Sequence, residues 1–283
     1  MTNWFQECDI IYGLISNLKN KHVIGMKNIK LLMEYDGANY HGWQRQKDHA
    51  TLQEIIEDRL FRITGERAAL ISASRTDAGV HAIGQVASFR TNSNLEPMTL
   101  QRALNATLPE DIRILNAEEA EDAFHPRYDA LSKSYFYIIS NTNFSSAFLY
   151  RYAWRVPYSL DLDEMKKAGD SLLGRHDFSA FRGAGCGAKS TVRDITSLSI
   201  EKISCIDFMT AKINGNFIKI RVEANAFLRH MVRNIVGMLV EIGRGEMTLN
   251  SVSEAIELKD RRKTGPTAPA HGLFLEKVKY HDS

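Results

Sequence analysis

The order of the secondary-structure signals restricts the fold of this chain more than any other feature. Between residues 29 and 115 the apolar patterns predict a strand, a helix, two strands, a helix and a strand. The expected strands are 29–35, 68–73, 85–89 and 112–115. One expected helix begins at a capping box at Thr51–Glu54, and the second spans about 99–106. This order is typical of the split β-α-β unit of ferredoxin-like domains. The sequence therefore predicts an α+β fold.

A similar alternation recurs after about residue 128, so we expect two ferredoxin-like halves with a mostly antiparallel sheet. In the second half, Asn214–Gly215 is a strong signal for a type I′ turn that joins strands 208–213 and 217–222. The other expected elements are a strand at 134–140 with Tyr135, Tyr137 and Ile139 on one face, a helix at 162–173 capped by Asp161 and ended at Gly174, helices from about Ala226 to Ile242 and from Ser251, and a last strand at 273–279.

Three regions follow from this pattern. Residues 27–128 are expected to form an N-terminal α+β domain, and residues 129–283 a C-terminal α+β domain. Residues 1–26 form an N-terminal extension, whose apolar positions fit an amphipathic helix. Either this extension is a genuine appendage, or Met26 is the natural start and the upstream residues come from an over-long gene prediction. We favour the second reading.

Composition narrows the class of protein without identifying it. With 283 residues, 44% of them hydrophobic, the chain can bury a large core. The net charge of +2 does not announce a nucleic-acid partner, although a balanced total can hide a basic cleft. The three cysteines lie far apart and argue against a zinc site and a disulfide framework. Because no segment is apolar enough to span a bilayer and no secretory signal is present, we expect a cytoplasmic protein without a membrane partner.

The segment Ser72–His81 is the strongest candidate for chemistry. It places Asp77 on a turn between two strands, and Gly79 can bend that turn through a positive φ. Carboxylates on loops of a rigid scaffold are often functional. The alternative is an aspartate that only caps the turn and pairs with Arg75.

The segment R-T-D-A-G-V-H (Arg75–His81) resembles the active-site signature of the tRNA pseudouridine synthase A family. Further segments follow in the order known for that family, and the resemblance extends from about Lys27 to the C-terminus. These segments are Tyr35–Gln46, Ala103–Pro109, Phe124–Arg127, Lys133–Tyr137, Asp177–Arg182, Asn225–Gly237 and Ala270–Leu275. The resemblance implies a continuous sheet shared by the two halves, with helices on one face and a central active-site cleft.

The resemblance also implies a reaction. Members isomerise uridine to pseudouridine in the tRNA anticodon stem-loop, at tRNA positions 38–40, without a metal or other cofactor, and work as homodimers. The family resemblance gives Asp77 the role of nucleophile. A nucleophilic carboxylate in a dry pocket needs a cation to stay ionised. Arg233 is our candidate, because it belongs to a polar stripe in an otherwise apolar predicted helix, and Arg229 is a weaker one. These arginines would otherwise bind RNA phosphate or a structural carboxylate.

Other site residues are carried over from the same resemblance. Tyr135 matches the tyrosine that stacks on the flipped base and relays a proton, although a tyrosine in such a strand is usually a core residue. Arg75 matches the residue that occupies the place of the flipped base. Leu273 matches the apolar pocket wall, with Leu275 as the alternative. Ser74 departs from the glycine found in many members, which could narrow the pocket rim and bears on substrate preference.

Basic side chains in expected loops and strand ends are candidates for contacts with RNA phosphates, although each alone is usually a solvated surface charge. The candidates are Arg45, Arg182, Arg127, Lys189 and Arg193. The run Arg261–Lys263 is expected at an exposed helix end. The glycine-rich segment 183–187 is expected to be a mobile loop and not a phosphate cradle.

Two other functions remain open at the level of sequence. The chain could be a catalytically idle RNA-binding module of the same fold, against which the presence of Arg75, Asp77 and Tyr135 argues. It could also be a hydrolase that uses Asp77 together with a second carboxylate. No second acid stands in a comparably constrained motif, which favours the isomerase.

Overall fold

A computed structural model describes residues 25–281 of the chain, except residues 145 and 209. The extension predicted for residues 1–26, with its amphipathic helix, lies almost entirely outside the described residues. Within them, no helix has the length and apolar character that a membrane span requires.

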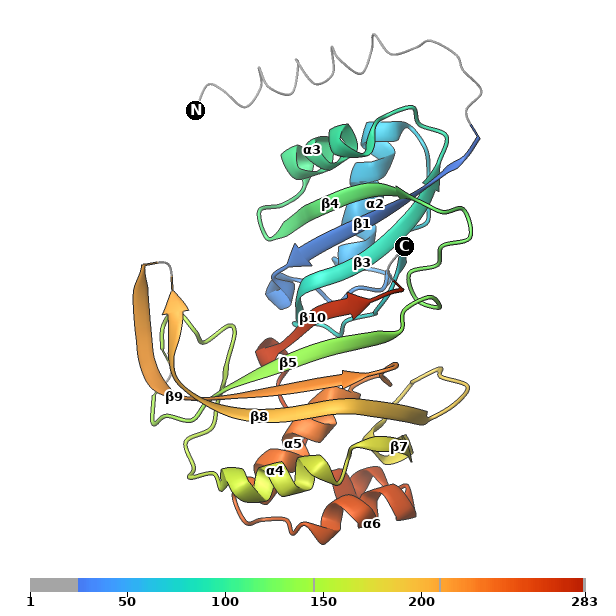
Figure 1. The fold of residues 1–283 in the computed structure, drawn as a ribbon. Coiled ribbons are helices and arrows are strands. Elements are labelled where there is room, and N and C mark those ends of the chain that lie inside the picture. The colour runs from blue at the N-terminus through green and yellow to red at the C-terminus, as the bar shows by residue number, and fades with distance from the viewer. Residues whose placement is uncertain (1–24, 145, 209, 282–283) are drawn as a thin grey trace.

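A single ten-stranded sheet runs through the molecule (Figure 1). Its main path is β4-β1-β3-β10-β5-β9-β8-β7, while β2 pairs with β3 and β6 with β5. All pairings are antiparallel except those of β10 with β3 and of β5 with β6. The strands are β1 (Lys27–Tyr35), β2 (Ile71–Ser72), β3 (His81–Thr91), β4 (Ile112–Ala120), β5 (Ser132–Ser140), β6 (Trp154–Arg155), β7 (Gly174–Asp177), β8 (Val192–Phe208), β9 (Ala211–Ala224) and β10 (Leu273–Lys279). The α+β class and the mostly antiparallel sheet are confirmed.

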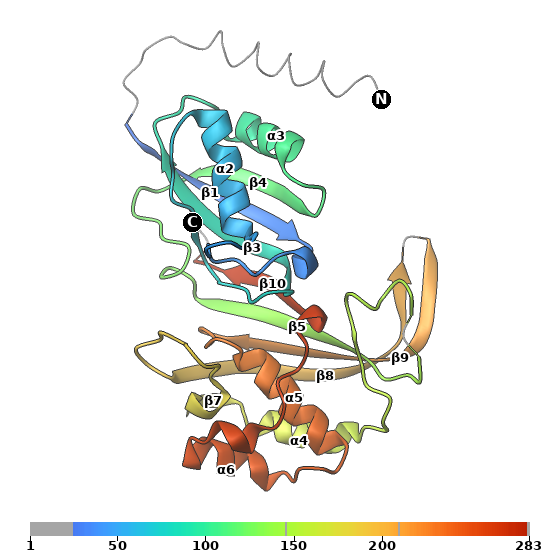
Figure 2. The same ribbon diagram turned by 180° about the vertical axis from the view of Figure 1, so that it is seen from behind.

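The helices pack on one face of this sheet. Helices α2 and α5 lie behind the strands in Figure 1 and in front of them in Figure 2, with α3 beside α2 and α4 beside α5. The bounds are α2 (Leu52–Thr64), α3 (Pro97–Thr107), α4 (Leu162–Asp170), α5 (Met231–Gly243) and α6 (Asn250–Leu258). The strands bury alternate side chains beneath the helices, as in β1, where Ile29, Leu31 and Met33 are buried. The core therefore lies between sheet and helices.

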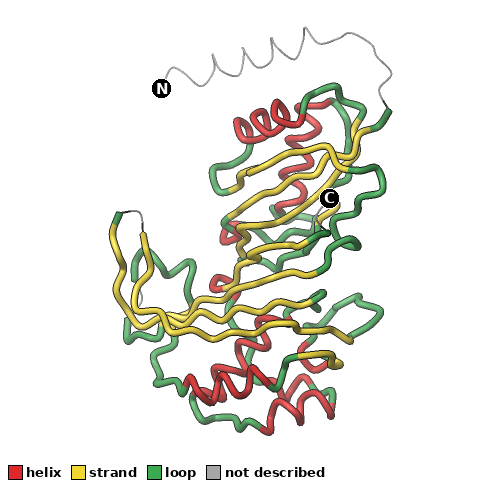
Figure 3. The backbone as a smooth tube through the Cα atoms, viewed as in Figure 1, coloured by secondary structure: helices red, strands yellow, loops and turns green. Residues whose placement is uncertain are grey.

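The two halves of the chain meet at β10, the last strand in the sequence. Phe274 and Leu275 pair with His81 and Ala82 of β3, and the other edge of β10 pairs with β5 along most of its length. Figure 3 shows the strands of both halves following one another as one twisted layer. This layer fixes the start of β3 beside β10, with β5 on the other side of β10.

The hairpin predicted at Asn214–Gly215 is wrong. Both residues lie inside β9, and Asn214 pairs with Cys205. The strands β8 and β9 stay paired as far as Phe208 and Ala211. A type I′ turn needs positive φ at both central residues, and neither residue has it. The register shifts beside Gly215, which marks a β-bulge rather than a turn.

Two helix starts also differ from the sequence prediction. Thr51 is the N-cap of α2, but its hydroxyl makes no capping bond and is buried without a hydrogen-bond partner among the described residues. Glu54, the other member of the predicted capping box, points to Arg45. Helix α5 begins at Met231 rather than near Ala226, because His230 takes a left-handed conformation with φ 62°. By contrast, Asp161 caps α4 as predicted, although α4 ends at Asp170.

Close contact between α5 and the segment after α6 gives the first prediction. A Cβ added at Gly237 would lie 1.8 Å from the carbonyl oxygen of Pro266. Gly237→Ala should therefore lower the free energy of unfolding by about 1–3 kcal/mol, the usual cost of overpacking. The measurement is urea unfolding followed by circular dichroism. Gly187→Ala is the matched control, since nothing lies within 4 Å of a Cβ there. Equal stability of the two variants would contradict this account of the α5 contact.

Candidate active site

The loop between β2 and β3 carries Asp77 and is held by the segment around Gly42. The N–H of Trp43 donates to the carbonyl of Thr76 at 3.0 Å, and the N–H of Gly79 donates to the carbonyl of Tyr40 at 3.3 Å. Gly79 has the predicted positive φ, 76°. The backbone of residues 40–43 therefore fixes the position of the Asp77 loop.

Gly42 makes this support possible. Its φ is 88°, and a Cβ there would lie 2.8 Å from the carbonyl oxygen of Thr76 and 3.0 Å from the N of Ala78. A side chain at this position would push the loop away. The segment Tyr35–Gln46 thus supports the Asp77 loop through its backbone.

Asp77 lies against two basic side chains from the other half of the chain. Its Oδ2 is 3.4 Å from Nη1 of Arg233 and 3.5 Å from Nε2 of His230. The carboxylate and the guanidinium are both largely buried, with 18% and 16% of their side chains exposed. Arg233 is braced by a bond from its Nε to the carbonyl of Ala268. The predicted pairing of Asp77 with Arg233 is confirmed.

The alternative partner of Asp77, Arg75, is not used. Arg75 is exposed, and its side chain has no hydrogen bond or ion pair among the described residues. The view of Asp77 as a turn cap paired with Arg75 is therefore wrong for this conformation. Arg75 is left free to meet a ligand.

His230 is a site residue that the sequence analysis missed. Burial lowers the pKa of His230 below its ordinary value, and the nearby Asp77 carboxylate opposes part of that shift. The ring packs against Gly183, since a Cβ there would lie 2.6 Å from its Nδ1. Arg229 donates to the carbonyl of Ala184 at 3.0 Å, so it holds the glycine-rich segment and not Asp77.

Tyr135 contacts the Asp77 loop through Ser74. The hydroxyl groups of Tyr135 and Ser74 are 2.6 Å apart. Burial raises the pKa of Tyr135 to about 12, and the Ser74 hydroxyl lowers it by less. The ring of Phe227 packs edge-on against Tyr135 with centroids 5.0 Å apart. Tyr135 is therefore both a core residue and part of the site.

A buried glutamine fixes the backbone of Ser74. Gln85 is completely buried; its Oε1 accepts from the N–H of Ser74 at 3.3 Å and its Nε2 donates to the Ser74 carbonyl at 2.7 Å. Nε2 also donates to the hydroxyl of Tyr35, which bonds to Thr76. These paired bonds hold the residues before and after Arg75 in one conformation.

Lys133 supports the same loop from β5. Its Nζ donates to the carbonyl of Ala73 at 2.6 Å, and the residue is only 6% exposed. Burial, together with the neighbouring cations Arg127 and Arg193, lowers the pKa of Lys133 to about 8. Among the described residues no carboxylate pairs with this ammonium, which is held by the Ala73 carbonyl.

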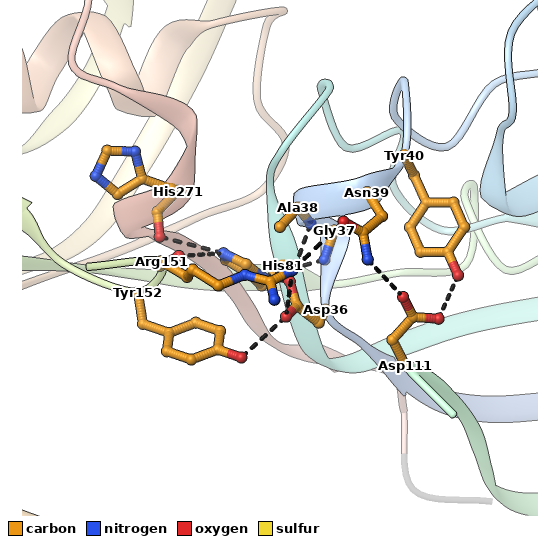
Figure 4. Close-up of polar contacts among 10 residues, drawn as sticks. All are labelled: Asp36, Gly37, Ala38, Asn39, Tyr40, His81, Asp111, Arg151, Tyr152 and His271. Atoms are coloured by element: carbon orange, nitrogen blue, oxygen red, sulfur yellow. Dashed lines mark hydrogen bonds and ion pairs between the residues drawn. The ribbon is translucent and has the colours of Figure 1, made fainter. Parts of the chain in front are cut away.

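A second polar cluster joins the two halves at the start of β3 (Figure 4). The Nδ1 of His81 is 2.9 Å from Oδ1 of Asp36, and its Nε2 is 3.1 Å from the carbonyl of Arg151 and 3.2 Å from that of His271. Tyr152 donates to the other oxygen of Asp36. The buried His81 thus ties the end of the Asp77 loop to the C-terminal half. Burial lowers its pKa, and Asp36 opposes that shift.

The remaining predicted residues differ in their surroundings. Leu273 and Leu275 are both buried on β10, and it is Leu275 that pairs with Tyr135, while Leu273 pairs with Tyr137. Arg45 is 3.8 Å from Glu54 and 3.7 Å from Glu57. Arg182 is exposed beside Gly183.

Arg261 is not a solvated surface charge as expected. Its guanidinium donates to Asn234, Thr264, Thr267 and the carbonyl of Gly265, so it braces α5. Asn234 in turn donates to the carbonyl of Phe181. The other members of the run do pair at the surface, Arg262 with Asp260 and Lys263 with Glu254.

A family model described as tRNA pseudouridine synthase matches residues 31–129 and 168–281. The first segment contains Asp77, and the second contains Arg233 and His230. A relative from Thermoanaerobacter sp. (strain X514), named tRNA pseudouridine synthase A, is 46% identical over 255 residues, which cover 90% of this chain and 100% of the relative.

The chain belongs to the tRNA pseudouridine synthase A family. Relatives of the same name from Thermodesulfovibrio yellowstonii and Myxococcus xanthus are 44% and 42% identical, over 90% and 91% of this chain and 100% and 93% of the relatives. Within residues 25–281, apart from the two internal gaps, no cluster of three or more histidine, cysteine or acidic side chains is suited to hold a metal. The family match thus falls on a site made of a carboxylate, cations and hydroxyl groups.

The buried ammonium of Lys133 gives a prediction about pH. Its pKa is about 8 in the folded protein, against an ordinary value near 10.5, so the unfolded chain holds more protons between these values. Stability must therefore rise with pH across this window. Between pH 8 and 10 the free energy of unfolding of the wild type should rise by about 2 kcal/mol more than that of the Lys133→Met variant. Urea unfolding of both proteins at several pH values measures the difference. Parallel pH profiles would contradict the depressed pKa.

Proposed function

We propose that this protein isomerises uridine to pseudouridine in tRNA, with Asp77 as its nucleophile. One observation carries the proposal: a largely buried carboxylate, in a chain of this family, lies against Arg233 and His230 and close to Tyr135. The relatives are named for the same reaction. The reaction breaks the N1–C1′ bond of uridine, rotates the base and forms a C5–C1′ bond, so no oxidant, reductant or cofactor is consumed.

The charges around Asp77 fit the nucleophile. A carboxylate that attacks carbon must be ionised, and burial alone would favour its neutral form. Arg233 supplies a permanent positive charge at 3.4 Å, and the bond to Ala268 keeps that charge in place. A hydrolase of the two-carboxylate type is disfavoured, because the charged groups that contact Asp77 within the described part of the chain are Arg233 and His230, with no second acid.

The remaining roles concern the flipped base. Extruding a base costs a few kcal/mol, and stacking it on an aromatic ring returns about 1–3 kcal/mol. Tyr135 takes the stacking and proton-relay role, and Leu273 with Leu275 forms the apolar wall beside it. Arg75 fills the place that the base leaves in the RNA, a role that suits its exposed and unpaired side chain.

The substrate is the tRNA anticodon stem-loop, at positions 38–40. Arg45 and Arg182 contact its phosphates. Both side chains are exposed, and Arg182 is the better placed of the two, because it adjoins the glycine that packs on His230. Arg45 must exchange Glu54 and Glu57 for phosphate. Both ion pairs are long, 3.8 and 3.7 Å, and the Arg45 side chain is 54% exposed, so the exchange costs little.

Assembly completes the proposal. The protein works in the cytoplasm as a homodimer, and each chain forms two ferredoxin-like halves that divide near residue 128, with the active-site cleft between them. The recurrence of the order β4-β1-β3-β2 in β10-β5-β9-β8 supports the two halves. An apolar hollow of about 390 Å³ on the helix-free face, lined by Phe136, Ile138 and Phe274 among others, supports a contact with a second chain.

Asp77→Asn tests the reaction at its centre. The amide keeps the size of the side chain but loses its charge and nucleophilicity, so formation of pseudouridine should become undetectable. Affinity for tRNA should persist or increase, because an anion near RNA phosphates has been removed. The assay is tritium release from tRNA labelled at C5 of uridine, run beside filter binding. Asp163→Asn is the control, since Asp163 is an exposed residue of α4. Near-normal release by Asp77→Asn would end the proposal.

Mapping of the products tests substrate and assembly together. Pseudouridine in unmodified tRNA treated with the purified enzyme should appear at positions 38–40 and nowhere else. One chain has a mass of 32.0 kDa, and sedimentation equilibrium should give twice that mass. Modification outside the anticodon stem-loop would reject the substrate, and a monomer at micromolar concentration would reject the dimer.

A further inference from the structure

Two hydroxyl groups next to Asp77 form an isolated pair. The oxygens of Ser74 and Tyr135 are 2.6 Å apart, and neither hydroxyl has another hydrogen bond among the described residues. Tyr135 is 6% exposed, whereas Ser74 is only partly buried. Tyr135 is thus almost fully buried, and its hydroxyl contacts the hydroxyl of a residue that is itself partly exposed.

The surroundings of Ser74 fix its hydroxyl in this place. Both backbone groups of Ser74 are bound by the buried Gln85, and the carbonyl before it accepts from Lys133. A serine on a free loop would lose side-chain and backbone freedom to keep such a bond. Because the backbone of Ser74 is already held, only the rotamer of its side chain has to be fixed to keep the bond.

The burial of Tyr135 restricts the protonation states that its hydroxyl can adopt. The pKa of Tyr135 is about 12, so a phenolate is unfavourable at neutral pH. The Asp77 carboxylate makes it more unfavourable. A phenol that accepts a proton from carbon must therefore release its own proton in the same step. The Ser74 oxygen is the acceptor within hydrogen-bond distance.

We propose that Ser74 is a positioning residue that connects the Tyr135 hydroxyl to solvent, so that Tyr135 can remove the proton from C5 without becoming charged. This rests on the proposed function. It also gives the departure at position 74 an effect on chemistry, whereas the sequence suggested only an effect on the pocket rim.

The step balances as follows. After the C5–C1′ bond has formed, the C5–H bond breaks and its electron pair forms the C5=C6 double bond. The former N1=C6 electron pair moves to N1, which takes a proton from water. The proton from C5 joins the phenol oxygen of Tyr135, whose own proton passes to Ser74 Oγ, and the Ser74 proton passes to water. Both hydroxyls end neutral, and the base has gained and lost one proton.

The test compares Ser74→Ala and Ser74→Thr with the wild type in single-turnover tritium release from C5-labelled tRNA. Ser74→Ala should lower the rate about tenfold, less than the roughly 10²–10⁴-fold of a direct general acid or base because Ser74 acts through Tyr135, and should raise the isotope effect at C5. Affinity for tRNA should change less than twofold. Ser74→Thr keeps a hydroxyl and should stay within about threefold of the wild type. Circular dichroism checks that each variant is folded.

Tyr135→Phe, alone and combined with Ser74→Ala, separates this role from a structural one. If Ser74 acts through the phenol, the double variant should be no slower than Tyr135→Phe alone. Multiplying losses in the double variant, an unchanged rate in Ser74→Ala, or a loss confined to tRNA affinity would each overturn the proposal. A wild type that makes no pseudouridine would instead reject the proposed function, so the two failures are distinguishable.

Discussion

The short parallel pairing of β10 with β3 is the contact on which the candidate site depends. Only two residue pairs, Phe274 with His81 and Leu275 with Ala82, are hydrogen-bonded neighbours across this seam. Gly84 leaves room for β10 to approach β3, since a Cβ at this position would lie 2.3 Å from the carbonyl oxygen of Glu276. The polar cluster of His81 and Asp36 closes the end of the seam. With the seam formed, Asp77 of one half meets the cations of the other.

Much of the fold could be predicted from local patterns. The last strand, 273–279, was predicted with its observed bounds, and alternate burial of Tyr135, Tyr137 and Ile139 followed from the period of two along a strand. The pairing of Asp77 with Arg233 could also be predicted from the sequence. An arginine in an otherwise apolar helix needs a partner, and the Asp77 loop was the most constrained carboxylate in the chain.

Other features depend on distant residues and were out of reach. The turn signal of Asn214–Gly215 is overridden because β8 and β9 are long and stay paired beyond it. The apolar pattern places His230 inside a helix, whereas in the structure a left-handed conformation at His230 starts α5 later, and the imidazole lies against Asp77. The contact of Ser74 with Tyr135 joins residues 61 positions apart, and no local pattern encodes it.

The place of β10 in the chain also governs when the site can exist during synthesis. The N-terminal half emerges from the ribosome first, and at the start of β3 its edge stays unpaired until residues 273–275 appear. An unpaired edge is a template for pairing with other chains. A stop codon anywhere before β10 would therefore leave Asp77 without this seam and release a protein prone to aggregate. Termination before β10 would thus yield no fragment with an assembled site, which makes the codons of residues 273–275 as necessary to the site as those of the Asp77 loop.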